Sequence, residues 1–360
     1  MKPTNNKPKE EQAFNPNAAA LPDSGIFGLP CDPKKDKVII LPVPFEATTS
    51  YGGGTANGPQ AIFHASKQVD LFDPITGNPY EAGISMLLES REIIALNKKA
   101  RALAQPIIQA GGVAPGNKRH ERDAAEVNEI CNRVHRKIYE HVKIQLERDK
   151  IPIVLGGDHS VAQGAIEAYA EKFPKLGVLQ IDAHADLRDG FEGFEYSHAS
   201  VMHNVLYRRL LPGSIERLVQ VGLRDIGPEE HECIQTERTM KIKAFFAHEV
   251  KRGACSPSFV SNIFWKIAQA LPDEVYVSFD IDGLDQSMCP HTGTPVPGGL
   301  TWDEMEQILQ ALVENGKRIV GCDLVEVTPG PTHGDEWDAN VGARVLYKLI
   351  GYMLLSQKNK

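Results

Sequence analysis

Acidic residues and histidines gather in three short segments of this 360-residue chain, and each segment directly follows an apolar run. In an extended backbone, side chains at alternate positions point the same way, so those of one segment converge. Ionised groups buried together without partners are costly, and a divalent metal removes that cost. Four carboxylates and two imidazoles suit two ions such as Mn²⁺ or Ni²⁺ better than one zinc ion. The candidate metal ligands are His159, Asp182, His184, Asp186, Asp280 and Asp282.

The apolar runs in front of these segments predict buried strands. They are short and continuous, which is typical of strands covered on both faces of a parallel sheet. Open α/β sheets place their ligand sites at the carboxyl ends of strands, so the three polar segments are expected to meet at that edge. The expected strands are Val38–Val43, Ile153–Leu155, Val178–Ile181, Leu218–Val221, Ala244–Phe246, Val275–Phe279 and Ile319–Val325.

Longer amphipathic stretches between the strands predict helices. Ser160 precedes one of them as an N-cap candidate, and Thr301 with Glu304 forms a capping-box pattern at another. Residues 82–122 have the least regular pattern and predict a long loop. Alternating strands and helices indicate an α/β fold with a mostly parallel sheet and helices on both faces. The expected helices are Asp123–Arg148, Val161–Lys172, Thr301–Asn315 and Glu336–Leu355.

The bulk composition limits the partners of the chain. Its formal net charge is −8 without a long basic run, so a nucleic-acid partner is not expected. No stretch approaches the roughly 18 apolar residues of a membrane helix, so no membrane partner is expected either. The six cysteines are scattered, which is typical of reduced thiols in a cytoplasmic protein. Residues 1–36 lack the apolar core of a secretory signal and are expected to form an extended or partly disordered arm.

Each polar segment alone is also typical of turns, helix caps and solvated loops, but all three in this order are not. The stretches GGDHS, DAHAD and SFDIDGLD are similar to the metal-binding signatures of the ureohydrolase family, which includes arginase, agmatinase and guanidinobutyrase. Further matches are Gly58-Pro59, the stretch from Gly293 to Gly299, and Glu326-Val-Thr-Pro329. The resemblance implies one three-layer α/β/α catalytic domain over residues 37–360, assembled as a trimer or hexamer.

The resemblance also implies a chemistry and a ligand scheme. Two metal ions would lower the pKa of water so that hydroxide forms near neutral pH and attacks a guanidinium carbon. The products would be urea, or a urea derivative, and an amine or ammonia. One ion would be held by His159, Asp182, Asp186 and Asp280, and the other by His184, Asp182, Asp280 and Asp282, with Asp182 and Asp280 as bridges.

Two further residues match catalytic positions of the family. His198 aligns with a histidine thought to shuttle protons, a task that suits a group titrating near neutrality. Glu326 aligns with a glutamate that pairs with the guanidinium, which a carboxylate can bind through two hydrogen bonds. The alternatives are a surface-loop histidine and a structural ion pair of the glutamate.

Some loops depart from the agmatinase pattern where the family binds the tail of its substrate. Ala199 and Ser200 replace Gly and Thr, and the sequence around His291 and Trp337 is bulkier and more polar. The stretches YSHAS and DEWDANVGAR are closer to the nickel-dependent guanidine hydrolase and metformin hydrolase branch. His291 and Trp337 are candidate substrate-binding residues for a small or methylated guanidine, because an aromatic face can hold such a cation. Ordinary packing of Trp337 and a solvated loop at His291 are the alternatives.

The sequence therefore favours a guanidine hydrolase-like enzyme and leaves other functions open. Within the same enzyme class, the substrate would be metformin, with this chain as one subunit, or agmatine, guanidinobutyrate or formiminoglutamate. In a different class, the chain would be a non-catalytic partner that joins a homologous second subunit. A metal-storage or regulatory protein would leave His198 and Glu326 unexplained.

Overall fold

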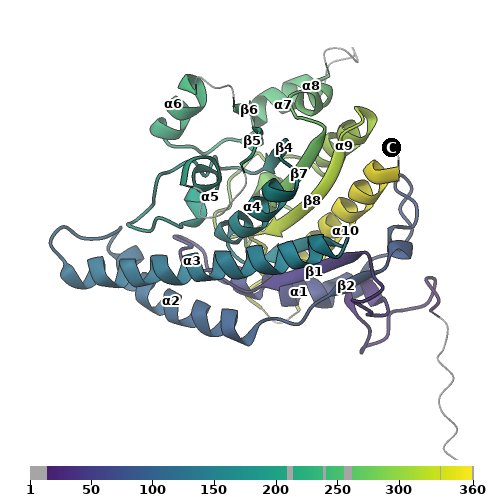
Figure 1. Cartoon of the computed structure of the whole chain (residues 1–360), viewed down its shortest axis with the longest axis horizontal. Coiled ribbons are helices and arrows are strands. Elements are labelled where there is room, and N and C mark those ends of the chain that lie inside the picture. Colours follow the sequence, from purple (N-terminus) through teal and green to yellow (C-terminus); the bar gives the residue numbers. More distant parts are fainter. Residues whose placement is uncertain (1–13, 209–213, 238–240, 255–261, 333, 359–360) are drawn as a thin grey trace, which may run out of the picture.

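The computed structural model describes residues 14–208, 214–237, 241–254, 262–332 and 334–358. The strands of this part of the chain form one sheet in the order β2-β1-β3-β8-β7-β4-β5-β6, and every strand pair in it is parallel (Figure 1). The strands are β1 (Val38–Val43), β2 (Ile84–Met86), β3 (Ile151–Gly156), β4 (Leu176–Ile181), β5 (Arg217–Leu223), β6 (Ile242–Phe246), β7 (Glu274–Asp280) and β8 (Arg318–Val325).

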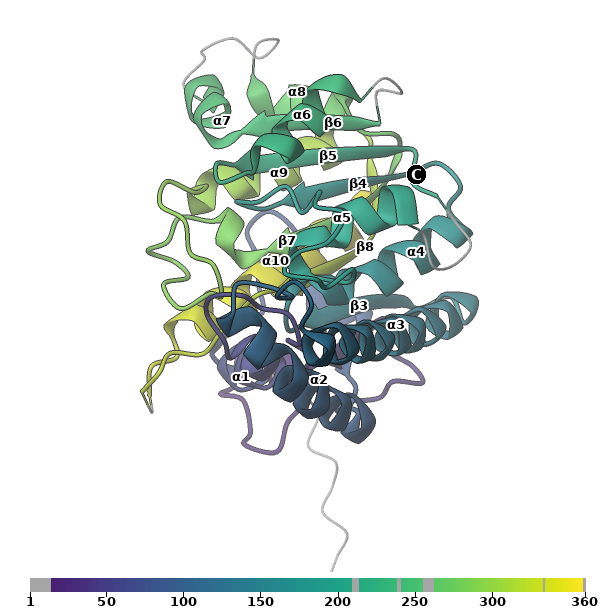
Figure 2. The ribbon, with the colours of Figure 1, turned by 90° about the vertical axis from the view of Figure 1, so that its left-hand side faces the viewer.

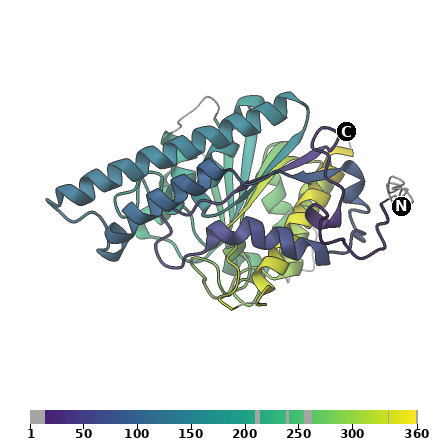
Figure 3. The ribbon, with the colours of Figure 1, turned by 90° about the horizontal axis from the view of Figure 1, so that it is seen from below.

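Helices cover both faces of this sheet, which confirms the predicted α/β architecture. One face packs against α3 and α4, with α2 lying alongside α3 (Figure 3), and the opposite face packs against α1, α8, α9 and α10. The helices are α1 (Gly58–Ala65), α2 (Arg91–Gln109), α3 (Lys118–Glu147), α4 (Ala162–Lys172), α5 (Val201–His203), α6 (Pro228–Thr236), α7 (Ala247–Ala254), α8 (Ile263–Gln269), α9 (Trp302–Glu314) and α10 (Trp337–Lys358).

The seven predicted strands are all present, because each run is apolar on both faces. In β7, Val277 and Phe279 pack into the core on one side of the sheet, and Tyr276 packs into the core on the other. Every residue of β3 and β4 is buried. The three-residue edge strand β2 was not predicted, since so short a run has no periodicity of its own.

The prediction of a long loop over residues 82–122 was wrong. Most of this region is α2, which begins after the N-cap Ser90 and buries Ile93, Ala100 and Ile107, spaced by two helical turns each. Pro106 lies inside this helix, and together with the charged residues it hides the pattern. Helix α3 also begins earlier than predicted, at Lys118, with Asn117 as its cap.

The strand order places the ends of four strands together at the centre of the sheet. After β3 the chain passes through α4 and crosses to β4, and β7 and β8 later fill the gap between these two strands (Figure 2). Their carboxyl ends therefore lie side by side at the point where ligands bind in doubly wound sheets. The three polar segments follow β3, β4 and β7, and Glu326 follows β8.

The part of the N-terminal segment that the structure describes packs against the sheet domain. Within residues 14–36, Ile26, Phe27 and Leu29 are buried, and the Phe27 amide donates to Ser66 Oγ at 2.9 Å. The first 13 residues of the predicted arm lie outside the described residues. The division into an arm up to residue 36 and a catalytic domain from residue 37 stays a prediction. No described helix combines the length and the apolar character needed to cross a membrane.

Candidate metal centre and substrate pocket

Tight backbone turns place the polar segments at the carboxyl edge of the sheet. Gly157 follows β3, where a Cβ would lie only 2.1 Å from the Phe45 carbonyl oxygen, so this position needs glycine. The next residue, Asp158, accepts a hydrogen bond from the Ser160 amide and caps the 3-10 turn that contains His159. The predicted N-cap role of Ser160 therefore belongs to Asp158.

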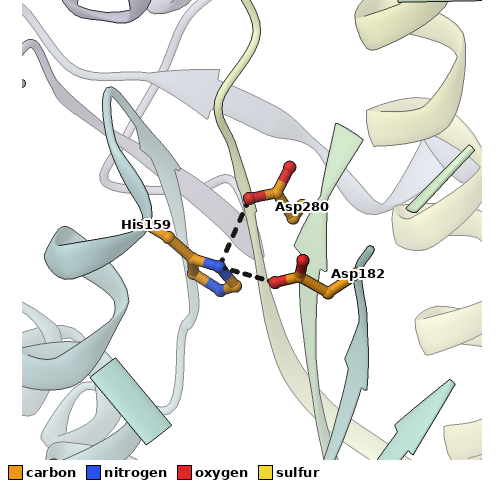
Figure 4. Close-up of side chains that lie close together, drawn as sticks. All are labelled: His159, Asp182 and Asp280. Carbon is orange, nitrogen blue, oxygen red and sulfur yellow. Dashed lines mark ion pairs between the residues drawn. The ribbon is translucent and has the colours of Figure 1, made fainter. Parts of the chain in front are cut away.

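The His159 side chain points towards Asp182 and Asp280, which lie at the carboxyl ends of β4 and β7 (Figure 4). Its Nδ1 lies 3.0 Å from Asp182 Oδ2, 2.9 Å from Asp186 Oδ2 and 3.3 Å from Asp280 Oδ2. Asp186 reaches this position from a left-handed backbone conformation (φ 53°). Three carboxylate oxygens thus lie within 3.3 Å of one imidazole nitrogen, a donor set that is typical of a metal site.

A second group of the same kind adjoins the first. His184 Nδ1 lies 3.1 Å from Asp282 Oδ2 and 3.5 Å from Asp182 Oδ1. Asp182 therefore presents one oxygen to each histidine, which is the geometry of a bridging carboxylate. The ligand atoms of His159, Asp182 and Asp280, and those of Asp182, His184 and Asp282, lie within 4.8 Å of one another in each group. The six predicted ligands are thus brought together as two adjoining groups that share Asp182.

The electrostatics of this cluster call for a cation. Burial and the neighbouring Asp182 charge raise the pKa of Asp186 to about 7, and burial with Asp282 and Asp182 raises that of Asp280 well above its usual range. Burial opposes the charged form of His184, but Asp282 and Asp182 raise its pKa to about 12. The carboxylates thus hold protons among themselves and on His184, and bound divalent cations would displace them.

A hydrogen-bonded chain behind His159 sets the orientation of its ring. Nε2 lies 2.9 Å from Ser278 Oγ, which donates to Asp323 Oδ1 at 3.0 Å. Because that serine proton is used, Nε2–H is the donor to Ser278, and Nδ1 is the ring nitrogen that faces the carboxylates. Burial opposes the charged form of this ring, but Asp182, Asp186 and Asp280 raise the pKa of His159 well above its usual range. A bound metal ion would take the place of the proton on Nδ1, and the donor set as a whole therefore fits a metal pair.

The cluster lines part of a cavity of about 150 Å³. The lining includes four of the candidate ligands, His159, His184, Asp186 and Asp280. It also includes both predicted catalytic residues, His198 and Glu326. The remaining lining residues, which we call the outer wall, are Ser50, Arg188, Phe191, Ala199, Asp225, Glu230 and Thr294.

His198 lines the same cavity as a buried, neutral imidazole. Its side chain is anchored near Ser50, whose Oγ lies 3.5 Å from Nε2, and its amide donates to Thr48 Oγ1 at 3.1 Å. Burial, reinforced by the nearby His184 charge, lowers the pKa of His198 to about 3. The low pKa keeps this ring in its neutral form at neutral pH. The surface-loop alternative does not fit a side chain only 8% exposed.

Glu326 presents one carboxylate oxygen to the cavity. It follows β8 in a left-handed conformation (φ 62°) and is 2% exposed. Oε1 accepts from the His159 amide at 2.9 Å, whereas Oε2 has no partner among the described residues. Burial, together with the Asp280 and Asp158 charges, raises the pKa of Glu326 well above its usual range. A cation in the cavity would lower that pKa and give Oε2 a partner.

The structure does not bring His291 and Trp337 to the cavity. His291 is held by Asp338, which accepts from the His291 amide at 3.0 Å and lies 2.9 Å from Nδ1. Trp337 is 52% exposed, and its Nε1 donates to the Ser287 carbonyl at 2.9 Å. The substrate-binding role expected for these two residues therefore finds no support in the structure.

The outer wall contains residues that the sequence interpretation missed. Arg188 and Phe191 come directly after the DAHAD segment, so their position next to the predicted ligands was an available signal. Asp225 and Glu230 follow β5, which carries no metal-type motif, and only the sheet order brings that strand beside β4. Their place at the cavity depends on tertiary structure alone.

Comparisons with known proteins agree with this geometry. The Arginase family model matches residues 36–351. An N(1)-aminopropylagmatine ureohydrolase of a Synechocystis species is 32% identical over 90% of this chain and 91% of that protein. The enzyme of the same name from Thermus thermophilus is 31% identical over 91% of this chain and 94% of its own. Among solved structures, proclavaminate amidino hydrolase from Streptomyces clavuligerus shares the fold, with a TM-score of 0.70, 22% identity, and 94% and 99% coverage of the two chains.

Proposed function

This chain belongs to the arginase family, and from that premise we propose that it hydrolyses a small guanidino compound without a carboxylate, with guanidine first and metformin second. Family membership makes it a hydrolase of C–N bonds in linear amidines that releases urea. From guanidine the products are urea and ammonia. From a substituted guanidine they are urea or a urea derivative and an amine.

The size and lining of the cavity carry this proposal. A cavity of about 150 Å³ has room for guanidinium and water. The free Oε2 of Glu326 offers the cation a charge-assisted hydrogen bond. A buried substrate carboxylate would in contrast need dedicated donors, because an unpaired one costs several kcal/mol.

Enzymes of this family use a binuclear metal site, and the residues present here fit one. The chemistry that a bound metal pair supplies is a lowered pKa of water, so that hydroxide is available near neutral pH. We propose Ni²⁺ or Mn²⁺, both of which accept imidazole and carboxylate ligands. Following the family scheme, one ion is assigned to His159, Asp182, Asp186 and Asp280, and the other to His184, Asp182, Asp280 and Asp282.

The chain's own residues orient the substrate and move protons. Glu326 accepts from the guanidinium through its free Oε2, and its other oxygen is already fixed by the His159 amide. His198 lines the cavity with a neutral ring at rest, and we assign it the transfer of a proton to the departing nitrogen. The leaving group is then ammonia rather than the strongly basic amide ion.

A second candidate is a guanidine with a cationic tail, such as agmatine. The exposed carboxylate of Asp225 in the outer wall favours it, because this group can pair with a distal ammonium. The two most similar relatives described above are named for such a substrate. Guanidinobutyrate is a third possibility within the same class.

The assembly and location are also proposals. We propose a trimer or hexamer of this chain; an assembly with a homologous second subunit, in the manner of metformin hydrolase, is the alternative. A purely non-catalytic partner role is disfavoured by the complete set of six convergent ligands. The five described cysteines carry free thiols, which supports our proposal of the reducing cytoplasm as the location.

Urea release from a panel of substrates tests the proposed function. The metal-depleted protein is reloaded with Mn²⁺ or Ni²⁺ and given guanidine, metformin, agmatine, guanidinobutyrate and arginine. We expect the highest kcat/KM with guanidine. A higher value with agmatine or arginine under either metal would overturn the substrate assignment, and two bound ions with no activity on any substrate would support the partner-subunit role.

A further inference from the structure

Arg188 is the one basic residue of the outer wall, within the part of the chain that the structure describes. Its amide donates to the Ala199 carbonyl at 3.3 Å, which ties it to the segment that carries His198. Its Nε lies 3.4 Å from Glu230 Oε2. Its guanidinium carbon lies 4.5 Å from the centre of the Phe191 ring, the distance of a cation–π contact. Arg188 is therefore held from several sides beside the reacting centre.

The supports of Arg188 are themselves fixed. Phe191 exchanges backbone hydrogen bonds with the buried Phe194, at 3.0 and 2.9 Å, and its ring packs edge-on against His198. Glu230 is buried and accepts from the Leu187 amide at 3.0 Å and from the Gly227 amide at 2.9 Å. These contacts hold Arg188 in the wall of the cavity, although its side chain is 40% exposed.

The outer wall affects how well the cavity can bind a guanidine that carries a tail. A tail leaving the reacting centre beside His198 meets the stacked Arg188–Phe191 pair and a fixed positive charge. Like charges in a partly desolvated site repel strongly, so a tail ammonium is disfavoured there. Without the Arg188 charge, the charged groups left in the outer wall would be Asp225 and Glu230, and both attract an ammonium.

We propose that Arg188, stacked on Phe191 and braced by Glu230, is a specificity-determining residue that rejects guanidines with a cationic tail and thereby restricts the enzyme to small guanidines. This inference rests on the proposed function and adds the residue that sets the substrate class. It also separates the two candidate substrate types, because the Arg188 charge opposes the attraction of the exposed Asp225 for an ammonium.

The test compares three variants that separate charge from bulk. Arg188→Ala removes both, Arg188→Met keeps most of the bulk without the charge, and Arg188→Lys keeps the charge without the planar stack. Glu230 retains its two amide donors in each variant, so the loops keep their support. Arg252→Ala is the matched control, because Arg252 is exposed on α7 and does not line the cavity.

Steady-state kinetics with guanidine, agmatine and 4-guanidinobutyrate give the first readout. We expect Arg188→Ala and Arg188→Met to raise the kcat/KM of agmatine relative to guanidine by tenfold or more, chiefly through KM. Arg188→Lys and Arg252→Ala should leave that ratio within twofold of the wild type. The second readout is calorimetric binding of agmatine to the metal-depleted proteins, which should tighten in the Ala and Met variants.

Each other outcome has a distinct meaning. A wild-type preference for guanidine that none of the Arg188 variants shifts, with folding and metal content intact, would overturn this inference and leave the proposed function standing. A wild type most active on 4-guanidinobutyrate, with that activity lost in Arg188→Ala, would overturn it by making Arg188 a carboxylate-binding residue. If the wild type releases urea from no guanidino compound, the proposed function itself fails. Tighter agmatine binding to the metal-free Ala and Met variants would in that case still support the role of Arg188 in rejecting a cationic tail.

Discussion

Asp182 faces both halves of the ligand cluster, one carboxylate oxygen towards each histidine. Asp280 is assigned the second bridge. We expect Asp182→Ala and Asp280→Ala to lose urea release entirely and to bind less metal, because removing a bridge damages both metal sites at once. Metal content by mass spectrometry and urea release measure this. Asp273→Ala is the matched control, since Asp273 is exposed at the opposite end of β7. Full activity with two ions in either bridge variant would contradict the ligand assignment.

His198 is buried at the cavity without lying among the clustered ligand atoms. We expect His198→Ala to keep both metal ions and to lose roughly 100- to 1000-fold in kcat, the size of a general acid–base contribution. Metal analysis together with steady-state kinetics checks both parts. Loss of metal in this variant would show that His198 is a ligand or a structural residue.

Residue types and spacing predicted which side chains would converge, because alternation along a strand end is a local property. The six candidate ligands therefore lie together in the structure. His291 and Trp337 were chosen from loop positions, and the Asp338 and Ser287 contacts that hold them away from the cavity depend on the fold. Arg188 adjoins the DAHAD segment in the sequence, whereas Asp225 and Glu230 reach the cavity only because the sheet order sets β5 beside β4.

At the scale of elements, the pairing of β7 with β8 orients a ligand. The register places Ser278 beside Asp323, and their hydrogen bond continues to His159 Nε2. We expect Ser278→Ala to weaken metal affinity by roughly 10- to 100-fold, as loss of such supporting contacts does. Competition with a chelator measures the affinity. Ser356→Ala removes another buried serine, which bonds the Ile319 amide at the other end of β8, and should leave metal affinity unchanged. Equal affinities for both variants would contradict the positioning role.

The sequence predicted two kinds of element well: strands that are buried on both faces, and helices whose first turn carries its own capping residues. The β3 and β4 runs are apolar throughout, and the capping box of Thr301 and Glu304 is present at α9. Helix α2 was missed because its buried face is a narrow stripe against α3, interrupted by charged residues and Pro106. Short elements such as β2 form only because a neighbouring strand supplies their hydrogen bonds.

At the scale of the whole molecule, a buried histidine links stability to pH. His135 of α3 is fully buried, its ring nitrogens have no partner among the described residues, and burial lowers its pKa to about 3. The unfolded chain binds a proton at this residue below about pH 6.5, which the folded chain does not. The free energy of unfolding therefore falls as pH drops through the window from about 6.5 to about 3, by ~1.4 kcal/mol per unit from this residue.

Urea denaturation of the wild type and His135→Phe at pH 7.5 and 5.5 tests this linkage. The variant should gain about 1.4 kcal/mol relative to the wild type over that interval, because phenylalanine takes up no proton. His141→Gln, which removes an exposed imidazole from the same helix, should show no such gain. Parallel pH dependences of the wild type and His135→Phe would contradict the expected cost of burying this imidazole.

The most direct test of the proposed guanidine hydrolysis follows the carbon atom of guanidine as it becomes the carbon of urea. The metal-loaded protein is incubated with ¹³C-guanidine and observed by NMR, with His198→Ala as the impaired control. The account predicts that the guanidine signal is replaced by that of ¹³C-urea, that ammonium appears in equal amount, and that the control is slower by roughly 100-fold or more. An unchanged guanidine signal from a protein that carries two metal ions and releases urea from agmatine would contradict the account.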